Sequence, residues 1–337
     1  MVGLARGRHR PGRLGRCNKA VDVHHVAGYR HRRSNLADSV ATLAQSRGFS
    51  GVVRVDRGEH PELAAAFGLA ERGYGIPHTM DTQLALASGV KPLTALVVVS
   101  LIEEGLLRLD APMRALLCAD LPLIDDAVSV EHRLATTQDY LTVLEGHPQK
   151  FPPGERFSYC NSGYVVLALL AERASGQDFP ALVQRRVCEP AGMVDTAFLR
   201  SDELPASAGR GYLDADGLRT NVLHLPVRGC GDGGIYTTAA DVHALWQALG
   251  HARVVSREWY AEMTRPRSEA PTESAHYGLG FWLPLPGDRV AFEGMDAGVS
   301  CRSVHQKETG VTHTVLANTS GGAWAISRHL DEQLFVA

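Results

Sequence analysis

The chain has 337 residues, of which 45% are hydrophobic and 21% charged, so it can bury a substantial core in one large or two modest domains. No run reaches the roughly 18 apolar residues of a membrane span, and no apolar signal-peptide centre stands near the start. The six cysteines are scattered, and no Cys or His group has zinc-site spacing. We therefore expect a cytoplasmic protein that uses no metal and no organic cofactor.

The net charge of −3 hides an uneven distribution of charge. Residues 1–33 carry nine Lys or Arg and one acid, which leaves 25 basic and 36 acidic residues for the rest of the chain. Because this stretch has no apolar periodicity, we expect residues 1–35 to form a disordered basic arm. A start codon placed too early would also explain the presence of this basic stretch. Binding of nucleic acid or an anionic surface by the arm is the weaker interpretation.

Hydrophobic periodicity and turn residues predict the elements in chain order. Residues 36–45 have the pattern of a helix, and residues 50–55 and 63–67 have that of a strand hairpin. The most apolar run, residues 93–107, is predicted to be a buried helix. Further helices are expected at residues 164–173, 179–187, 237–250 and 323–335, and strands at residues 277–283, 289–292, 299–304 and 312–316.

Strands therefore lie near both ends of the chain, and helical patterns dominate the middle. This order predicts an α+β fold in which the N- and C-terminal parts form one antiparallel sheet flanked by helices. We expect residues 36–337 to form a single domain with a mainly helical lobe at about residues 110–225. The functional cleft is then expected between the lobe and the sheet.

A serine and a lysine stand three residues apart at the start of the apolar run. If the helix begins near Ser88, Pro92 lies in its first turn, where a missing backbone N–H costs little. Residues three apart share a helical face, so the Lys91 amine can reach the Ser88 hydroxyl. Ser-x-x-Lys alone is more often an ordinary surface pair, but a lysine at the head of a buried helix favours an activated nucleophile.

A second motif follows at residues 153–164, with the pattern Pro-Gly-x-x-Phe-x-Tyr-x-Asn-x-Gly-Tyr. Three further segments agree with it in order, at residues 190–196, 233–241 and 298–300. Together these motifs resemble the serine β-lactamase and penicillin-binding protein superfamily. The resemblance is closest to the class C-like branch, which holds β-lactamase-related hydrolases, esterases, D-aminopeptidases and D-alanyl carboxypeptidases. It covers about residues 49–335 and implies a β-lactamase/transpeptidase-like fold.

The resemblance implies roles for four residues. Ser88 would be the acylating nucleophile and Lys91 its proton acceptor, while Tyr159 would shuttle protons between the nucleophile, the leaving group and the attacking water. Asn161 would hydrogen-bond the substrate and help to orient Lys91. The ordinary lysine pKa of about 10.4 must fall for this role, and we expect burial and a neighbouring positive field to lower it. Taken singly, Tyr159 fits a half-buried core residue and Asn161 a helix cap.

The third family motif is altered. The resemblance places Lys or His, then Thr or Ser, then Gly on a strand beside the cleft, and this chain has Phe-Glu-Gly at residues 292–294. Gly294 permits close approach of the substrate to the strand. The Met295 N–H, together with the Ser88 N–H, would then form the oxyanion hole.

The altered motif also changes the expected charge of the substrate site. The family cation helps to bind a substrate carboxylate, and here two acids, Glu293 and Asp296, are expected at the site instead. We therefore expect uncharged or cationic esters or amides as substrates and weak β-lactamase activity. Strand alternation makes it plausible that one of the two acids points away from the cleft.

A further departure lies at residues 128–140, where the family often has His-Leu-Leu-x-His-x-Ser-Gly and a longer loop. This copy is shorter and has no Ser-Gly turn, which puts the shape of the cleft and the activity in doubt. His132, His305 and His313 are expected to be structural.

These observations predict a serine hydrolase that acts through an acyl-enzyme on a small ester, amide or short peptide. Within the same class, the alternatives are a D-aminopeptidase and a D-alanyl carboxypeptidase. From another class, the alternative is an inactive binding or regulatory relative, against which the retention of Ser88, Lys91, Tyr159 and Asn161 argues. A nucleic-acid partner is not favoured, and the sequence does not indicate an oligomeric state.

Overall fold

A computed structural model describes residues 30–109, 133–144, 151–152 and 155–335. Outside these residues lie most of the predicted arm, the first part of the expected helical lobe, and Cys17, Cys118, His132, Pro153 and Gly154. The first helix, α1 (Arg30–Arg47), begins within the stretch expected to be the arm.

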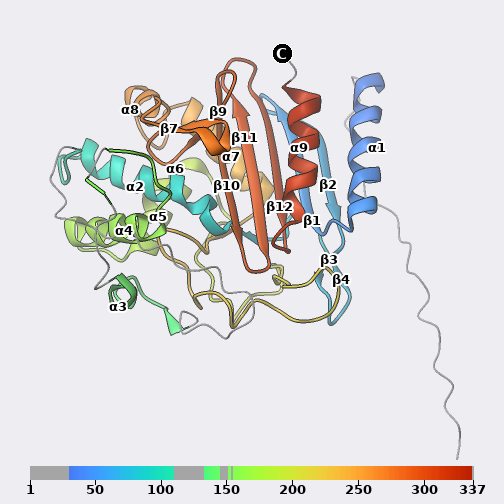
Figure 1. The fold of residues 1–337 in the computed structure, drawn as a ribbon, viewed down its shortest axis with the longest axis horizontal. Helices are drawn as coiled ribbons and strands as arrows, with labels where there is room; N and C mark the ends of the chain where they lie inside the picture. The colour runs from blue at the N-terminus through green and yellow to red at the C-terminus, as the bar shows by residue number, and fades with distance from the viewer. Residues whose placement is uncertain (1–29, 110–132, 145–150, 153–154, 336–337) are drawn as a thin grey trace, which may run out of the picture.

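The centre of the molecule is an antiparallel sheet of eight strands (Figure 1). Its order is β2-β1-β12-β11-β10-β9-β8-β7, so two strands from the start of the chain join six from its last part. Strand β1 pairs with β12 over its whole length, with Val53 opposite Val315. This confirms the predicted α+β fold. The strands are β1 (Gly51–Arg57), β2 (His60–Phe67), β7 (Ser268–Ala270), β8 (Ala275–Tyr277), β9 (Trp282–Pro284), β10 (Arg289–Asp296), β11 (Val299–Gln306) and β12 (Val311–Ala317).

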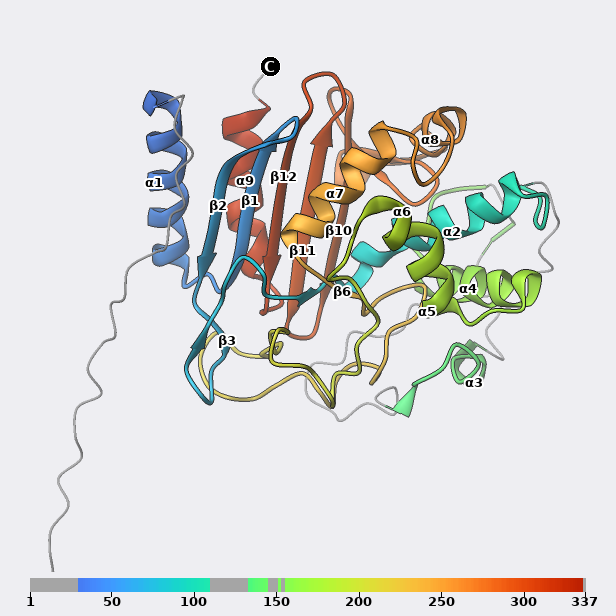
Figure 2. The same ribbon diagram turned by 180° about the vertical axis from the view of Figure 1, so that it is seen from behind.

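Helices cover both faces of the sheet, as the two views in Figures 1 and 2 show. On one face, α9 (Gly322–Leu334) lies on β11 and β12, and α1 packs beside it. On the other face, α7 (Ala239–Gly250) crosses β1 and β12. The Thr238 hydroxyl caps α7 by accepting the Asp241 N–H, and a helix was expected here.

Strand alternation divides the core into two layers. Val52 and Leu316 are buried on the side of α7, whereas Val53 and Val315 are buried beneath α1 and α9. Because successive strand residues point to opposite faces, a strand covered on both sides is buried at every position. In β12 the apolar residues 315–317 are therefore consecutive, and the polar Thr312, His313 and Thr314 are buried as well. These three side chains hydrogen-bond His305, Asp331 and Ser303, respectively.

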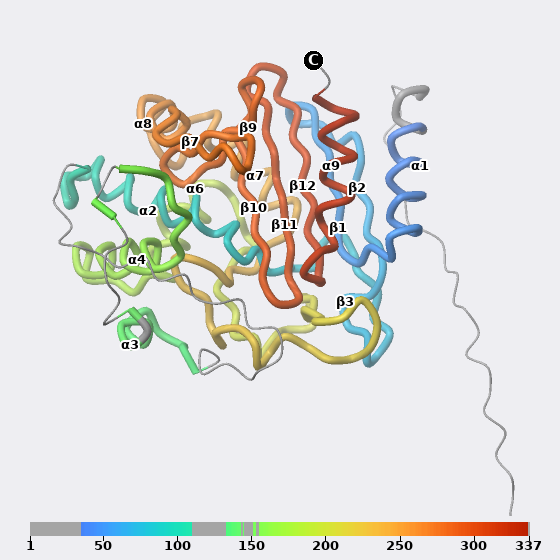
Figure 3. Tube along the Cα trace, in the orientation of Figure 1, coloured from blue at the N-terminus to red at the C-terminus, as the bar shows by residue number. Residues whose placement is uncertain are grey.

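The helical lobe packs against one end of the sheet, with α2 (Lys91–Glu103) at its centre (Figure 3). The sequence predicted that this helix would run to residue 107. Instead α2 ends at Glu103, just before Gly105, which takes a φ of 75°. The other elements are β3 (Leu69–Glu71), β4 (Ile76–Pro77), β5 (Leu84–Ala85), α3 (Leu141–Leu144), α4 (Asn161–Ser175), α5 (Phe179–Val183), a π-helical turn (Gln184–Cys188), α6 (Glu189–Ala191), β6 (Tyr236–Thr237), α8 (Arg257–Met263) and a 3₁₀ turn (Pro271–Glu273).

Two sequence predictions were wrong in this region. Residues 193–235 form turns and isolated bridges, although residues up to 225 were expected to be mainly helical. The strand expected at residues 277–283 is a hairpin, because the Gly278 N–H bonds the Phe281 carbonyl and Gly280 takes a φ of 92°. In the described ranges, no helix has both the length and the apolar character needed to cross a bilayer.

Candidate active site

Ser88 lies in a tight 3₁₀ turn, Ala87–Val90, that leads directly into α2. Ala87 has a φ of 43°, which is a strained conformation for a residue with a Cβ. The turn is fixed from outside by a bond from the Leu86 N–H to the Ile235 carbonyl, at 2.9 Å. Such strain persists only where the surrounding structure determines it, and it is concentrated at functional sites.

Lys91 is the first residue of α2, and only 2% of it is exposed. Its Nζ donates to the Ser88 Oγ at 2.9 Å and to the Asp232 carbonyl oxygen at 2.8 Å. It also lies 4.9 Å from the centre of the Tyr159 ring and 5.4 Å from that of Tyr164. The spacing argument therefore placed the amine and the hydroxyl together correctly.

Burial lowers the pKa of Lys91 to about 8. The expected positive field is not the cause, because the charged neighbours of the amine are acidic. Asp232, Asp296 and Cys160 all act to raise the pKa, and burial outweighs them. A pKa this close to neutrality makes the uncharged form of Lys91, which can accept a proton, far more accessible than in an ordinary lysine.

Tyr159 also hydrogen-bonds Ser88, so the Ser88 hydroxyl contacts both the lysine and the phenol. Burial of Tyr159 raises its pKa above the ordinary value, so the phenol stays neutral at physiological pH. The ring stacks on Trp282 with a centroid distance of 6.2 Å and an interplanar angle of 4°. Tyr277 packs edge-on against Trp282 and shares a 2.9 Å hydrogen bond with Tyr164. Sequence reasoning did not identify this aromatic wall, because β9 brings Trp282 to the site from a distant part of the chain.

Asn161 is the first residue of α4 and is not its cap. The cap is Cys160, whose sulfur accepts the Gly163 N–H at 3.3 Å. The Asn161 Oδ1 is buried and has no hydrogen-bond partner among the described residues. The expected link from Asn161 to Lys91 is thus not made here, and the Asp232 carbonyl contacts the amine instead.

β10 passes very close to the Ser88 turn. A Cβ on Gly294 would lie 2.7 Å from the Ser88 nitrogen and 2.1 Å from the Leu86 carbonyl oxygen, so only glycine fits. Met295 follows, with its side chain 45% exposed. Phe292 occupies the position of the family cation, is buried, and stacks on Trp246 at 5.5 Å.

The two acids of β10 lie on opposite faces of the strand. Glu293 pairs with Arg302, which also bonds Asp331 of α9 at 3.2 Å, so Glu293 is directed away from Ser88. Asp296 shares its face with Gly294 and lines a cavity beside the Ser88 turn. His313 completes the network on the α9 face through a 2.8 Å contact with Asp331, which agrees with a structural role.

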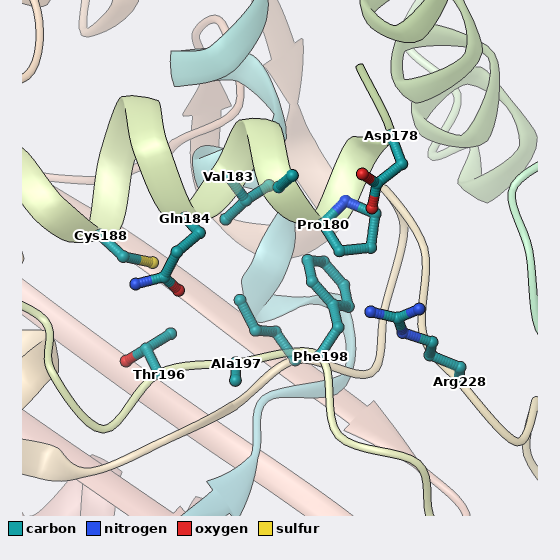
Figure 4. A pocket seen from close by; sticks show the side chains of 11 residues that line it. Asp178, Pro180, Val183, Gln184, Cys188, Thr196, Ala197, Phe198 and Arg228 are labelled. Atoms are coloured by element: carbon teal, nitrogen blue, oxygen red, sulfur yellow. The ribbon is translucent and has the colours of Figure 1, made fainter.

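A cavity beside the Ser88 turn has a volume of about 60 Å³ and includes Ala87, Tyr140, Asp232, Gly233 and Asp296 in its wall. A larger cavity of about 300 Å³ lies between α5 and residues 196–198, with Asp178 and Arg228 near one end (Figure 4). Neither cavity has Ser88, Lys91 or Tyr159 in its wall, and the smaller one borders the Ser88 turn through Ala87. In the described ranges, no three His, Cys, Asp or Glu side chains gather as metal ligands would.

Comparison with known proteins gives consistent matches. The family model described as Beta-lactamase matches residues 36–333. A penicillin-binding protein of Bacillus subtilis (strain 168) is 27% identical over 325 residues, or 86% of this chain and 72% of that protein. A D-aminopeptidase of Brucella anthropi is 28% identical over 313 residues, or 82% of this chain and 57% of that protein. The chain thus spans only part of the length of these curated relatives.

A solved structure is similar over nearly all of its length. The crystal structure of a penicillin binding protein from Bacillus halodurans superposes with a TM-score of 0.79 at 29% identity. The match covers 87% of this chain and 99% of that one.

The close approach of β10 to the Ser88 turn can be tested with Gly294→Ala. The added Cβ would meet backbone atoms that cannot rotate away, so we expect the free energy of unfolding to fall by about 1–3 kcal/mol. Gly250→Ala, where the Cβ meets open space, is the matched control and should stay within about 1 kcal/mol of wild type. Equal denaturant midpoints for Gly294→Ala and wild type would contradict this packing.

Proposed function

Because this chain belongs to the β-lactamase family of serine hydrolases, we propose that Ser88 is its nucleophile and that it hydrolyses an ester or amide through an acyl-enzyme. The observation that carries the proposal is the 2.9 Å contact between Ser88 and a buried lysine whose pKa is about 8. Such a lysine is a competent base near neutral pH, whereas an exposed lysine is not.

In the acylation step, uncharged Lys91 accepts the Ser88 proton as Oγ attacks the substrate carbonyl. The N–H groups of Ser88 and Met295 are the proposed donors to the oxyanion, and Gly294 is the residue that lets the two elements meet. Tyr159, neutral and in contact with Ser88, relays the proton from Lys91 to the leaving group, so Lys91 is uncharged again. In deacylation the same groups take a proton from the water that attacks the acyl carbon. They return it to the Ser88 Oγ as the acid is released.

The substrate class follows from the charge around this site. Phe292 supplies no cation for a substrate carboxylate, and Asp296 lines the cavity beside Ser88. We therefore propose uncharged or cationic esters, amides or short peptides as substrates, with weak turnover of β-lactams. The similarity to a D-aminopeptidase supports a small amide or peptide, whereas a carboxypeptidase would need a group that binds a carboxylate. We do not include Glu293 in the substrate site, because Arg302 engages it on the other face.

The proposed nucleophile can be tested with a fluorophosphonate probe and intact-mass measurement. We expect one adduct on wild type and none on Ser88→Ala. Ser46→Ala removes an exposed serine that bonds only its own helix, and it should label like wild type. An absence of labelling on wild type would favour the inactive-relative alternative, and labelling of Ser88→Ala would place the nucleophile elsewhere.

The pH dependence of turnover tests the proposed base. Since Lys91 must be uncharged to act, we expect kcat/KM for p-nitrophenyl acetate to rise with pH and to level off above about 8. Lys91→Arg keeps the positive charge but cannot lose its proton, so kcat should fall roughly 10²- to 10⁴-fold. Lys307→Arg, at a turn far from Ser88 in the sheet, is the control. A flat profile between pH 6 and 9 would exclude Lys91 as the base.

The proposed preference against carboxylates predicts poor penicillin turnover. Placing the penicillin carboxylate beside Asp296 costs several kcal/mol, so kcat/KM for benzylpenicillin should lie at least roughly 100-fold below that for p-nitrophenyl acetate. Comparable values for the two substrates, measured spectrophotometrically on one preparation, would overturn this part of the proposal.

A further inference from the structure

Thr94 is a buried polar residue in α2, the helix built from the most apolar run of the chain. It lies one turn after Lys91, and none of its surface is exposed. A hydroxyl buried among apolar side chains is costly unless it finds a hydrogen-bond partner, and valine has nearly the same shape without that cost. The hydroxyl at this position therefore needs a partner that explains it.

The partner of the Thr94 hydroxyl lies outside its own helix. A threonine inside a helix commonly donates to the carbonyl four residues back. Here the Val90 carbonyl oxygen is 3.5 Å away, at the limit of a hydrogen bond. The Gly231 carbonyl oxygen is much closer, at 2.6 Å, and accepts the bond instead. Thr94 thus ties α2 to the glycine-rich segment at residues 231–234.

The glycine-rich segment is also held by α4 and by the Ser88 turn. A Cβ on Gly231 would lie 2.3 Å from the Tyr164 carbonyl oxygen, so only glycine lets the segment approach α4 this closely. A Cβ on Gly233 would lie 3.7 Å from the Ala87 carbonyl, in ordinary contact with the Ser88 turn. Packing on three sides therefore fixes the position of the segment, and the Thr94 hydrogen bond fixes the side that faces α2.

Asp232 is the next residue of the segment, and its backbone carbonyl contacts the proposed base. The Lys91 Nζ lies 2.8 Å from the Asp232 carbonyl oxygen and 2.9 Å from the Ser88 Oγ. An uncharged amine has two N–H groups and one lone pair, whereas a carbonyl oxygen can only accept a hydrogen bond. The Asp232 carbonyl must therefore face an N–H and never the lone pair, so the lone pair remains available to the Ser88 hydroxyl.

We infer that Thr94 is a positioning residue for Lys91, the proposed base. Its hydroxyl fixes the peptide group between Gly231 and Asp232, and the Asp232 carbonyl then holds the amine toward Ser88. Both hydrogen bonds of Thr94 go to backbone carbonyls, so it acts through the glycine-rich segment and not on the reacting atoms. This inference rests on the proposed function, because it concerns how Lys91 takes the Ser88 proton.

The test separates the hydroxyl of Thr94 from its shape. Thr94→Val keeps the shape and removes the hydroxyl, whereas Thr94→Ser keeps the hydroxyl and removes a methyl group. With p-nitrophenyl acetate, we expect kcat/KM of Thr94→Val to fall roughly 10- to 100-fold, because a misplaced catalytic group costs rates of this order. Thr94→Ser should stay within about threefold of wild type, since its hydroxyl can still donate to Gly231.

Two further variants serve as controls. Thr314→Val makes the same change at a buried threonine of β12, which shares a 2.9 Å hydrogen bond with Ser303. Its denaturant midpoint should fall about as far as that of Thr94→Val, while its kcat/KM stays within about twofold of wild type. Thr94→Cys replaces the hydroxyl with a weak donor and should lie at least about fivefold below Thr94→Ser, which provides a second route if Thr94→Val does not fold.

These comparisons can overturn the inference. If Thr94→Ser is as impaired as Thr94→Val or Thr94→Cys, the hydroxyl has no special role. If Thr314→Val loses as much activity as Thr94→Val, the loss reflects general destabilisation of the protein and not the position of Lys91.

A pH profile distinguishes positioning from general damage to the site. A carbonyl that accepts a hydrogen bond from Lys91 favours the charged amine and so raises its pKa. In Thr94→Val this contact weakens, so the pKa of Lys91 should fall and the rise of kcat/KM should move to lower pH than in wild type. Water that enters a damaged site would instead raise the pKa of Lys91 toward the ordinary value. A lower plateau with an unchanged midpoint, or with a midpoint at higher pH, would contradict the inference.

Lys91→Arg separates this inference from the proposed function. If Lys91→Arg loses activity but Thr94→Val does not, Lys91 remains the proposed base and only the positioning role is wrong. If Lys91→Arg keeps full activity, the proposed base is wrong, and the positioning role is overturned with it. In the Lys91→Arg background, Thr94→Val should change kcat/KM by less than about twofold, because residues that act through one another are not additive. A full additional loss in the double variant would show that Thr94 does not act through Lys91.

Discussion

The removal of one lysine amine from water is the constraint on which the rest of this structure depends. The proposed role of Lys91 as a base requires a low pKa, and burial is what lowers it. The buried amine must still be satisfied, and the Ser88 hydroxyl and the Asp232 carbonyl do so. Three parts of the structure keep the Lys91 amine buried: the helical lobe around α2, the aromatic wall of Tyr159, Tyr277 and Trp282, and the glycine-rich segment at residues 231–234.

Local spacing was sufficient for much of the fold and for the central pair of the site. Residues three apart on a helix meet whatever the rest of the chain does, so the sequence pattern alone was enough to place Ser88 and Lys91 together. Strand and helix patterns failed where glycine interrupts an apolar run. Gly105 ends α2 early, and Gly280 converts one expected strand into the hairpin of β8 and β9.

The remainder of the site depends on contacts that sequence patterns do not carry. Asp232 holds Lys91 through its backbone carbonyl, which every residue possesses, so its side chain gave no signal for that contact. The only sequence feature that marks this position is an acid, Asp232, between the glycines of residues 231–234. The sequence also did not show whether Glu293 or Asp296 of β10 faces Ser88. Strand alternation places the two acids on opposite faces of the sheet, but it does not say which face lies toward Ser88. The Arg302 and Asp331 contacts of Glu293 decide it.

The sheet order also bears on when the protein acquires activity during its synthesis. Ser88 precedes Gly294 by more than half of the chain, and β1 must await β12 for a partner. Pairings so distant in sequence form slowly and only after the later strands exist. On the ribosome, the Ser88 segment is therefore made long before Ile235, which fixes its turn, and before β10, which carries the proposed oxyanion donor Met295. If Ser88 is the nucleophile, as proposed, late assembly would keep it inert until the end of synthesis.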